Sequence, residues 1–276
     1  MKLYHTARGI LLESGGKHYA IDRPWDDLIN DDDLAATLQR YTTDREPVAD
    51  AGAWLRELRI PAVSQEIWAS GVTYYNSKMA RQEESKQAGG GTFYERVYVA
   101  DRPELFFKAT PARAVASGGQ VAIRRDSTWD VPEPELTLVV TASGKIVGYT
   151  VGNDMSSRSI EGENPLYLPQ AKTYDACAGV GPCVYVTEEP LPADTTIRMT
   201  VQRGGAEVFS GTTDLAQMKR QPQELVDYLF RECSFPHGCL LMTGTGIVPG
   251  SDFTLAGGDE IRISIDHIGT LTNYVR

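Results

Sequence analysis

The sequence predicts a mixed, β-rich α+β protein in which a small N-terminal α+β domain, residues 1–62, precedes a barrel or rolled β-sheet. Two observations lead to this prediction. From Phe106 onward, short apolar runs are separated by Gly and Pro, as is typical of successive strands. Helical patterns are rare in the same region. A doubly wound α/β fold needs a helix between successive strands, so a barrel or rolled sheet is favoured.

In the N-terminal part, residues 10–12 and 19–21 are expected to be strands joined at Gly15-Gly16, a dipeptide typical of hairpins. Helices are expected over residues 34–38, after an acidic run that suits the helix dipole, and over residues 51–58. None of these segments carries a pattern of reactive side chains. We therefore expect no chemistry in this domain.

Residues 72–95 are expected to form a lid over the following domain. Residues 76–88 are polar and helix-permissive, and they end in Gly89-Gly90-Gly91, which favours mobility. A polar helix with a glycine hinge is typical of a lid. An ordinary surface helix and loop explains the same residues equally well.

The β-rich part is expected to hold strands near residues 121–123, 136–140, 146–152, 184–186, 197–202, 240–242 and 261–265. A single helix, near residues 223–232, interrupts them.

Composition excludes several classes of function. The chain has 27 Lys and Arg against 37 Asp and Glu, a formal net charge of −10, so a nucleic-acid partner is not expected. Four cysteines without a C-x-x-C pair indicate reduced thiols rather than a disulfide framework. The first residues lack a signal-peptide core, and no apolar run reaches the ~18 residues of a membrane span. A cytoplasmic protein without a membrane partner is expected.

The most informative segment is Pro132-Glu133-Pro134-Glu135-Leu136. Residues two apart on a strand share one face, so Glu133 and Glu135 project together. The prolines cannot donate ladder hydrogen bonds, which places the pair at a strand end or edge. They also fix φ and so stiffen the backbone that carries both carboxylates.

A hairpin brings a third carboxylate to this pair. If Ser143-Gly144 forms a two-residue turn, opposed residue numbers sum to 287, so Glu133 faces Asp154 and Glu135 faces Gly152. A turn one residue longer would shift this register. In either case Glu133, Glu135 and Asp154 converge at the open end of the hairpin.

Three neighbouring carboxylates cannot all stay ionised without compensation, and a cation provides it. Oxygen ligands without local His or Cys favour Mg²⁺, with Mn²⁺ or Ca²⁺ as alternatives, over zinc. The alternative reading is a solvated acidic strand end without a metal.

Together with other motifs of the chain, these residues resemble the fumarylacetoacetate hydrolase family. The resemblance runs from about residue 65 to 276 and rests on motifs whose order and spacing are specific. They are Arg102-Pro103-Glu104-Leu105-Phe106-Phe107-Lys108, Glu133-Pro134-Glu135, Gly148-Tyr149-Thr150-Val151-Gly152-Asn153-Asp154, Gln170-Ala171-Lys172-Thr173-Tyr174-Asp175, Gly181-Pro182 and Thr243-Gly244-Thr245. The resemblance implies a rolled mixed β-sheet as a catalytic domain, residues 63–276, and assigns Mg²⁺ to Glu133, Glu135 and Asp154.

Within this family the segments 94–98, 163–172 and 243–250 resemble the 2-keto-3-deoxy-D-arabinonate dehydratases. The hydrolase members carry a His–Glu dyad in the lid, and Ser77 and Ala80 stand at the comparable positions here. Without that dyad the usual activation of water for C–C hydrolysis is missing, whereas an elimination does not need it. Ser159 also departs from the family, which often has Asp after Arg158, and this leaves the role of Arg158 open.

The resemblance implies an Mg²⁺-dependent hydro-lyase that converts a 2-keto-3-deoxy-pentonate into 2,5-dioxopentanoate. C3 deprotonation would give a metal-bound enolate, and the C4 hydroxyl would then leave. The alternative is an Mg²⁺-dependent hydrolase of a 2,4-diketo acid or a fumarylpyruvate-like substrate. Decarboxylation of an oxaloacetate-like acid and non-catalytic binding are further alternatives.

The resemblance also assigns the remaining site residues. Lys172 is expected to be the base and Glu104 its acid/base partner, while Thr245, Thr73 and Lys108 are expected near the substrate. From the residues alone, Lys172 and Glu104 would be solvated side chains and Thr245 a turn residue. A homodimer or homotetramer is expected, because family members usually assemble in this way.

Overall fold

The structure, a computed structural model, describes residues 1–43, 45–75 and 96–276. Most of the expected lid, together with Ser77 and Ala80, lies outside the described residues.

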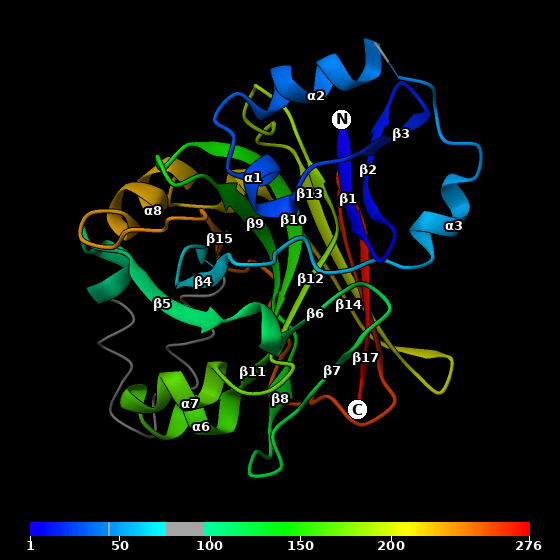
Figure 1. Cartoon of the computed structure of the whole chain (residues 1–276). Coiled ribbons are helices and arrows are strands. Elements are labelled where there is room, and N and C mark those ends of the chain that lie inside the picture. The colour runs from blue at the N-terminus through cyan, green and yellow to red at the C-terminus, as the bar shows by residue number, and fades with distance from the viewer. Residues whose placement is uncertain (44, 76–95) are drawn as a thin grey trace.

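The largest sheet of the described chain is ten-stranded and mixed (Figure 1). Its order is β3-β2-β1-β12-β10-β9-β15-β4-β5, with β6 beside β12. Strands β15 and β4 are parallel, as are β12 and β6, and the other pairs are antiparallel. In chain order the strands are β1 Lys2–Thr6, β2 Gly9–Ser14, β3 Lys17–Ile21, β4 Glu66–Gly71, β5 Glu104–Ala109, β6 Ala114–Val115, β9 Pro134–Val140, β10 Ile146–Asp154, β12 Ala178–Tyr185 and β15 Cys239–Met242.

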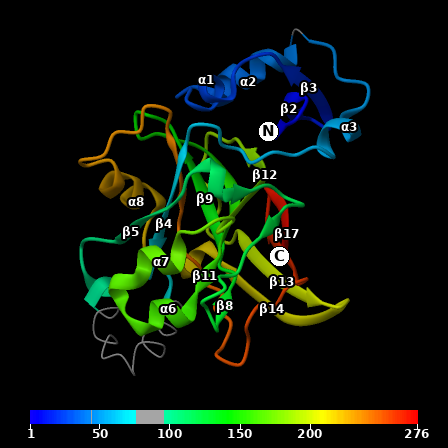
Figure 2. The ribbon, with the colours of Figure 1, turned by 60° about the horizontal axis from the view of Figure 1, so that its bottom comes forward.

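A second sheet packs against the first (Figure 2). Its order is β14-β13-β16-β17-β7, and a short pair, β8 and β11, lies beside the end of β10. Their bounds are β7 Gln120–Val121, β8 Asp130–Val131, β11 Ser156–Ser157, β13 Thr196–Arg203, β14 Ala206–Asp214, β16 Glu260–Ile265 and β17 Gly269–Val275.

Side chains alternate along each strand and therefore point to both faces of the large sheet, and each face packs into a core. Leu136 and Leu138 of β9 pack with Ile263 of β16 in the core between the two sheets. Val139, which points the other way, packs in the second core with Leu28 and other helical residues.

Short helices pack around the large sheet. Helices α1 (Trp25–Ile29) and α2 (Leu34–Thr43) lie against one face of it, and α6 (Arg158–Glu163) and α7 (Leu168–Lys172) lie beside β8 and β11 (Figure 1). Further helices are α3 Ala51–Leu55 and α8 Pro222–Leu229, and short 3₁₀ turns lie at η1 Pro111–Arg113, η2 Pro165–Tyr167 and η3 Leu215–Gln217.

The β9–β10 hairpin differs from the expected two-residue turn near its tip. Thr141 N donates to Lys145 O at 2.9 Å, so the loop is one residue longer, and Gly144 takes a positive φ of 83°. A register shift between Ile146 and Gly148 compensates for the extra residue. Beyond this bulge, Gly152 pairs with Glu135 as predicted.

The mixed fold class is confirmed, and the sheets are open rather than closed into a barrel. Each strand expected in the sequence coincides with an observed strand or overlaps one, and so do the helices expected near residues 34–38, 51–58 and 223–232. The boundary at residue 62 stays a prediction. The hydrogen bonds between β1 and β12 make the first strands part of the large sheet.

Candidate active site

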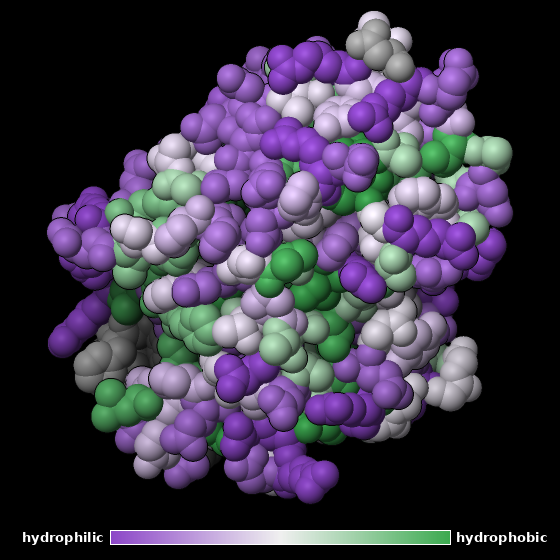
Figure 3. Space-filling model, in the orientation of Figure 1, coloured by the Kyte–Doolittle hydropathy of each residue, from purple (hydrophilic) through white to green (hydrophobic). Residues whose placement is uncertain are grey.

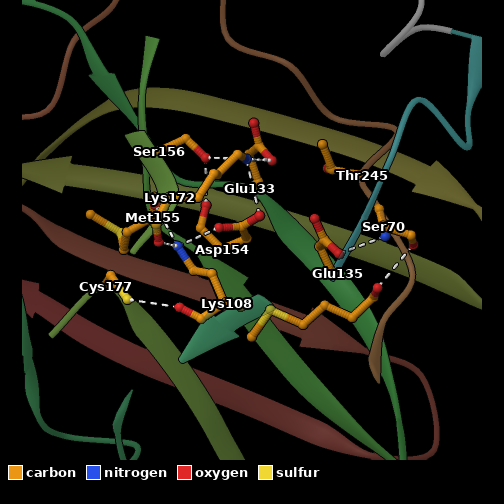
Figure 4. A network of polar contacts seen from close by, with 12 residues as sticks. Ser70, Lys108, Glu133, Glu135, Asp154, Met155, Ser156, Lys172, Cys177 and Thr245 are labelled. Carbon is orange, nitrogen blue, oxygen red and sulfur yellow. Dashed lines mark hydrogen bonds and ion pairs between the residues drawn. The ribbon is translucent and has the colours of Figure 1, made fainter. Parts of the chain in front are cut away.

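Three buried carboxylates meet at the open end of the β9–β10 hairpin (Figure 4). Glu133 and Glu135 flank Pro134, the first residue of β9, and Asp154 is the last residue of β10. Asp154 N donates to Glu133 O at 2.9 Å. One oxygen of each carboxylate lies within 4.8 Å of the others. The hairpin thus brings together the three predicted metal ligands.

Lys172, the last residue of α7, points into this cluster (Figure 4). Its Nζ donates to Glu133 Oε2 at 2.7 Å, to Asp154 Oδ2 at 3.0 Å and to Ser156 Oγ at 2.6 Å. The Phe106 ring lies 5.6 Å away, and the side chain is buried. The predicted base is therefore within contact distance of two predicted metal ligands.

Two more basic side chains reach the same carboxylates. Arg158 Nη2 donates to Glu133 Oε1 at 2.7 Å, and Lys108 Nζ lies 2.6 Å from Asp154 Oδ1. Both side chains are buried. The role of Arg158, left open by the sequence, thus includes an ion pair with Glu133. Together these side chains offset the negative charge on Glu133 and Asp154.

Glu135 has different surroundings. Its Oε2 accepts a hydrogen bond from Gly244 N at 2.5 Å, and no ion pair to it occurs among the described residues. Burial, followed by the charges of Asp154 and Glu133, raises the pKa of Glu135 well above its usual range. Glu135 is therefore the carboxylate at which additional positive charge would be most stabilising.

The donor set fits a hard divalent ion. Oxygens bound to one Mg²⁺ at ~2.1 Å lie at most ~4.2 Å apart, so a small movement would bring all three carboxylates to one ion. All three donors are oxygens, which Mg²⁺ and Mn²⁺ prefer. Such an ion would offset the neighbouring negative charges that help to raise the pKa of Glu135.

Glu104 begins β5 and lies half-buried opposite Gly71 of β4. A Cβ atom on Gly71 would lie 2.0 Å from Glu104 Oε2, so the glycine leaves space for this carboxylate. Positions two apart on β5 share a face, which places Glu104, Phe106 and Lys108 on one side. Phe106 and Lys108 of this set contact Lys172.

The two candidate threonines lie near the loop after β15. Thr245 is buried and follows Gly244, the donor to Glu135; its Oγ1 lies 3.2 Å from Ile247 O and 3.1 Å from Ile247 N. Thr73 Oγ1 donates to Thr243 O at 2.6 Å. Both therefore border the Glu135 side of the cluster, and a substrate contact of either stays a prediction.

Sequence reasoning missed Ser156. Its hydroxyl donates to Asp154 O at 3.0 Å and accepts from Lys172 Nζ. A lone serine after Asp154 carries no spacing signal for this contact. Ser159, the departure from the family pattern, lies in a hydroxyl cluster with Ser127 and accepts from Thr128 N at 3.1 Å.

The surface seen in Figure 3 is mainly hydrophilic, with small scattered apolar areas. None of the helices in the described ranges combines the length and the apolar character that crossing a bilayer requires.

Comparisons with known proteins agree with this architecture. Over 245 residues the chain is 49% identical to a probable 2-keto-3-deoxyxylonate dehydratase of Haloferax volcanii, covering 88% of this chain and 82% of that one. It is 40% identical over 266 residues to the 2-dehydro-3-deoxy-D-arabinonate dehydratase of Saccharolobus solfataricus, covering 89% and 88%.

Among solved structures, the chain resembles a 2-keto-3-deoxy-D-arabinonate dehydratase complexed with magnesium and 2,5-dioxopentanoate. The TM-score is 0.83 and the identity 35%, over 100% of this chain and 99% of that one. The family model described as fumarylacetoacetate hydrolase C-terminal matches residues 67–276, which include every predicted site residue. The chain belongs to the fumarylacetoacetate hydrolase family.

Proposed function

We propose that this protein is an Mg²⁺-dependent hydro-lyase that removes water from a 2-keto-3-deoxy-pentonate to give 2,5-dioxopentanoate. The observation that carries the proposal is the contact of the buried Lys172 Nζ with both Glu133 and Asp154. It places a basic nitrogen beside an oxygen site that fits the ion. The two similar dehydratases support the choice of substrate class.

Glu133, Glu135 and Asp154 would hold Mg²⁺, with Mn²⁺ or Ca²⁺ as possible substitutes. When bound, the ion supplies Lewis acidity toward the 2-keto acid end of the substrate. The protein's own contribution is to fix these oxygens on a stiff hairpin and to bury them.

In the metal-free site Lys172 is an ammonium that donates to Glu133, Asp154 and Ser156. A bound dication would favour the neutral amine, which would then take one proton from C3. Its contacts with Glu133, Asp154 and Ser156 fix the position of Nζ, and the Phe106 ring covers another side. A positioned base of this kind typically contributes about 10²–10⁴-fold to the rate.

Glu104, on the neighbouring strand β5, would give a proton to the C4 hydroxyl, which leaves as water when the C4–O bond breaks. The product of this step is a 2-oxo-3-ene acid with a C5 hydroxymethyl group. The Glu104 carboxylate would then take a proton from C5, and the Lys172 ammonium would return a proton to C3, which gives an enol and restores both residues. Its tautomerisation produces the C5 aldehyde of 2,5-dioxopentanoate, so one water is lost overall.

Thr245, and less directly Thr73, would bind the substrate on the Glu135 side of the cluster. Support comes from the hydrogen bond of the adjoining Gly244 to Glu135 and of Thr73 to Thr243 O. Backbone N–H groups and hydroxyls of such a loop are suitable donors to a carboxylate or keto oxygen.

We also propose a cytoplasmic setting and a homodimer or homotetramer. The four cysteines are free, and three of them are buried, as expected in a reducing compartment. Light scattering coupled to size-exclusion chromatography would determine the oligomeric state.

The function is tested with purified protein and 2-keto-3-deoxy-D-pentonate, in Mg²⁺ or in EDTA. An NADP-linked semialdehyde dehydrogenase reports 2,5-dioxopentanoate. Metal-dependent product is expected. Absence of product, together with cleavage of a 2,4-diketo acid, would contradict the dehydratase and support the hydrolase alternative.

A further inference from the structure

Three separate segments of the site meet at one atom, Lys108 Nζ (Figure 4). The ammonium donates to Met155 O at 2.9 Å and to Lys172 O, and it lies 2.6 Å from Asp154 Oδ1. Lys108 belongs to β5, Asp154 ends β10, and Lys172 ends α7. A single side chain thus ties the predicted base to a predicted metal ligand.

Two hydrogen bonds and one ion pair already engage the Lys108 ammonium. An ammonium has three N–H donors, and three oxygens surround this one. The residue is 0% exposed, and its Nζ also lies 5.7 Å from the Tyr174 ring centroid. A direct substrate contact, as first expected for Lys108, would require it to give up one of these partners.

The two oxygens of Asp154 are divided between two lysines. Lys108 forms an ion pair with Oδ1 at 2.6 Å, and Lys172 donates a hydrogen bond to Oδ2 at 3.0 Å. Because a carboxylate rotates about a single bond, fixing Oδ1 also fixes the direction of Oδ2. Lys108 at the same time satisfies the carbonyl at the last residue of α7, a group without a partner inside the helix.

We propose that Lys108 is a positioning residue: it orients Asp154 toward the metal site and fixes the end of α7 so that Lys172 Nζ stays beside Glu133 and Asp154. It touches neither the substrate nor the ion. The part that concerns Lys172 as a base rests on the proposed function, whereas the part that concerns Asp154 does not. Outer residues that orient metal ligands typically change metal affinity or activity by about 10–100-fold when removed.

The test uses Lys108→Met, Lys108→Arg and a matched control, Lys145→Met. Lys145 is half-exposed and lies 3.8 Å from Asp33, far along the hairpin from Asp154. Mn²⁺ affinity is measured by electron paramagnetic resonance without substrate, and kcat and KM are measured by the coupled assay. Circular dichroism establishes which variants fold.

Both Lys108 variants are expected to weaken Mn²⁺ binding by about 10–100-fold and to lower kcat by a similar factor. KM should stay within about threefold of the wild type. The Arg variant should lose affinity although it keeps the charge, because the buried space fits an ammonium. Lys145→Met should match the wild type.

Unchanged Mn²⁺ affinity in a folded Lys108 variant would overturn the proposal. A raised KM with unchanged kcat would overturn it as well and assign Lys108 to the substrate. If the Met variant does not fold, Lys108→Arg and Lys108→Gln decide by the same readouts. If the wild-type protein does not dehydrate the pentonate, the proposed function fails, while Mn²⁺ binding still decides the role of Lys108.

Discussion

Glu133 and Glu135 lie on either side of Pro134, yet they have opposite electrostatic surroundings. Glu133 contacts Lys172 and Arg158 through its two oxygens, at 2.7 Å each. Glu135 accepts a hydrogen bond from Gly244 N and faces the charges of Asp154 and Glu133. Two carboxylates of one motif are thus expected to differ in their effect on stability while sharing one role in metal binding.

The same substitution should therefore have opposite effects on the free energy of unfolding in EDTA at pH 7. Glu133→Gln leaves two buried cations with weaker partners and should cost about 3–5 kcal/mol. Glu135→Gln removes a buried charge without a cationic partner and keeps an amide oxygen for Gly244 N, so it should stabilise the protein. Urea unfolding of both variants measures this. Equal destabilisation by the two would contradict the assigned surroundings.

The pH dependence of stability should separate wild type from Glu135→Gln. The native pKa of Glu135 is raised, so the native state binds its proton more readily than the unfolded state does, whose value is about 4.3. The stability contributed by this proton is present at low pH and is lost as pH rises from about 4 through the native pKa. The advantage of Glu135→Gln should therefore grow with pH across that window, as followed by urea unfolding at a series of pH values. An advantage independent of pH would count against the raised pKa.

Loss of the Ser156 hydroxyl should lower kcat, whereas loss of the Ser157 hydroxyl should not. Ser156→Ala removes the neutral contact of Lys172 Nζ and should lower kcat by about tenfold with little change in KM, while Ser156→Thr should retain most activity because it keeps the hydroxyl. Ser157 is equally buried, but its hydroxyl bonds Ser127 and caps α6. Ser157→Ala should thus keep kcat, apart from a cost in stability of about 1 kcal/mol. Equal kcat for both alanine variants would argue against positioning by Ser156.

Gly71 offers a test of Glu104 that leaves the carboxylate in the chain. In Gly71→Ala the new Cβ would lie 2.0 Å from Glu104 Oε2 and 2.7 Å from its Cδ, so the side chain must move. If Glu104 delivers the proton to the leaving hydroxyl, kcat should fall by about 10–100-fold. Gly257→Ala, where no atom lies within 4 Å of the new Cβ, is the matched control. Wild-type kcat in a folded Gly71→Ala would remove Glu104 from the reaction.

The carboxylate cluster could be predicted from the sequence because it depends on local geometry. Period-two alternation sets Glu133 beside Glu135, and hairpin pairing brings Asp154 to them. The expected turn was one residue too short, and the shift between Ile146 and Gly148 restored the register. The three carboxylates therefore meet as predicted, although the predicted two-residue turn was wrong.

The contacts around that cluster could not be predicted from local patterns. Lys172, Arg158 and Lys108 reach it from elements that are separated from the carboxylates by 18 residues or more. No spacing rule links such positions, so only the family resemblance indicated Lys172. Strand β14 was missed for a different reason: most of its residues are exposed, so it lacks the apolar alternation that marks a half-buried strand.

The role of Lys172 as the base is tested by the turnover of C3-deuterated 2-keto-3-deoxy-D-pentonate by wild type and Lys172→Met in Mg²⁺. Single turnovers of the wild type should show a primary isotope effect. Lys172→Met should lose at least about 10²-fold in rate and should still bind Mn²⁺. Lys172→Met that binds Mn²⁺ and dehydrates the substrate within about tenfold of the wild-type rate would contradict the assignment of Lys172 as the base.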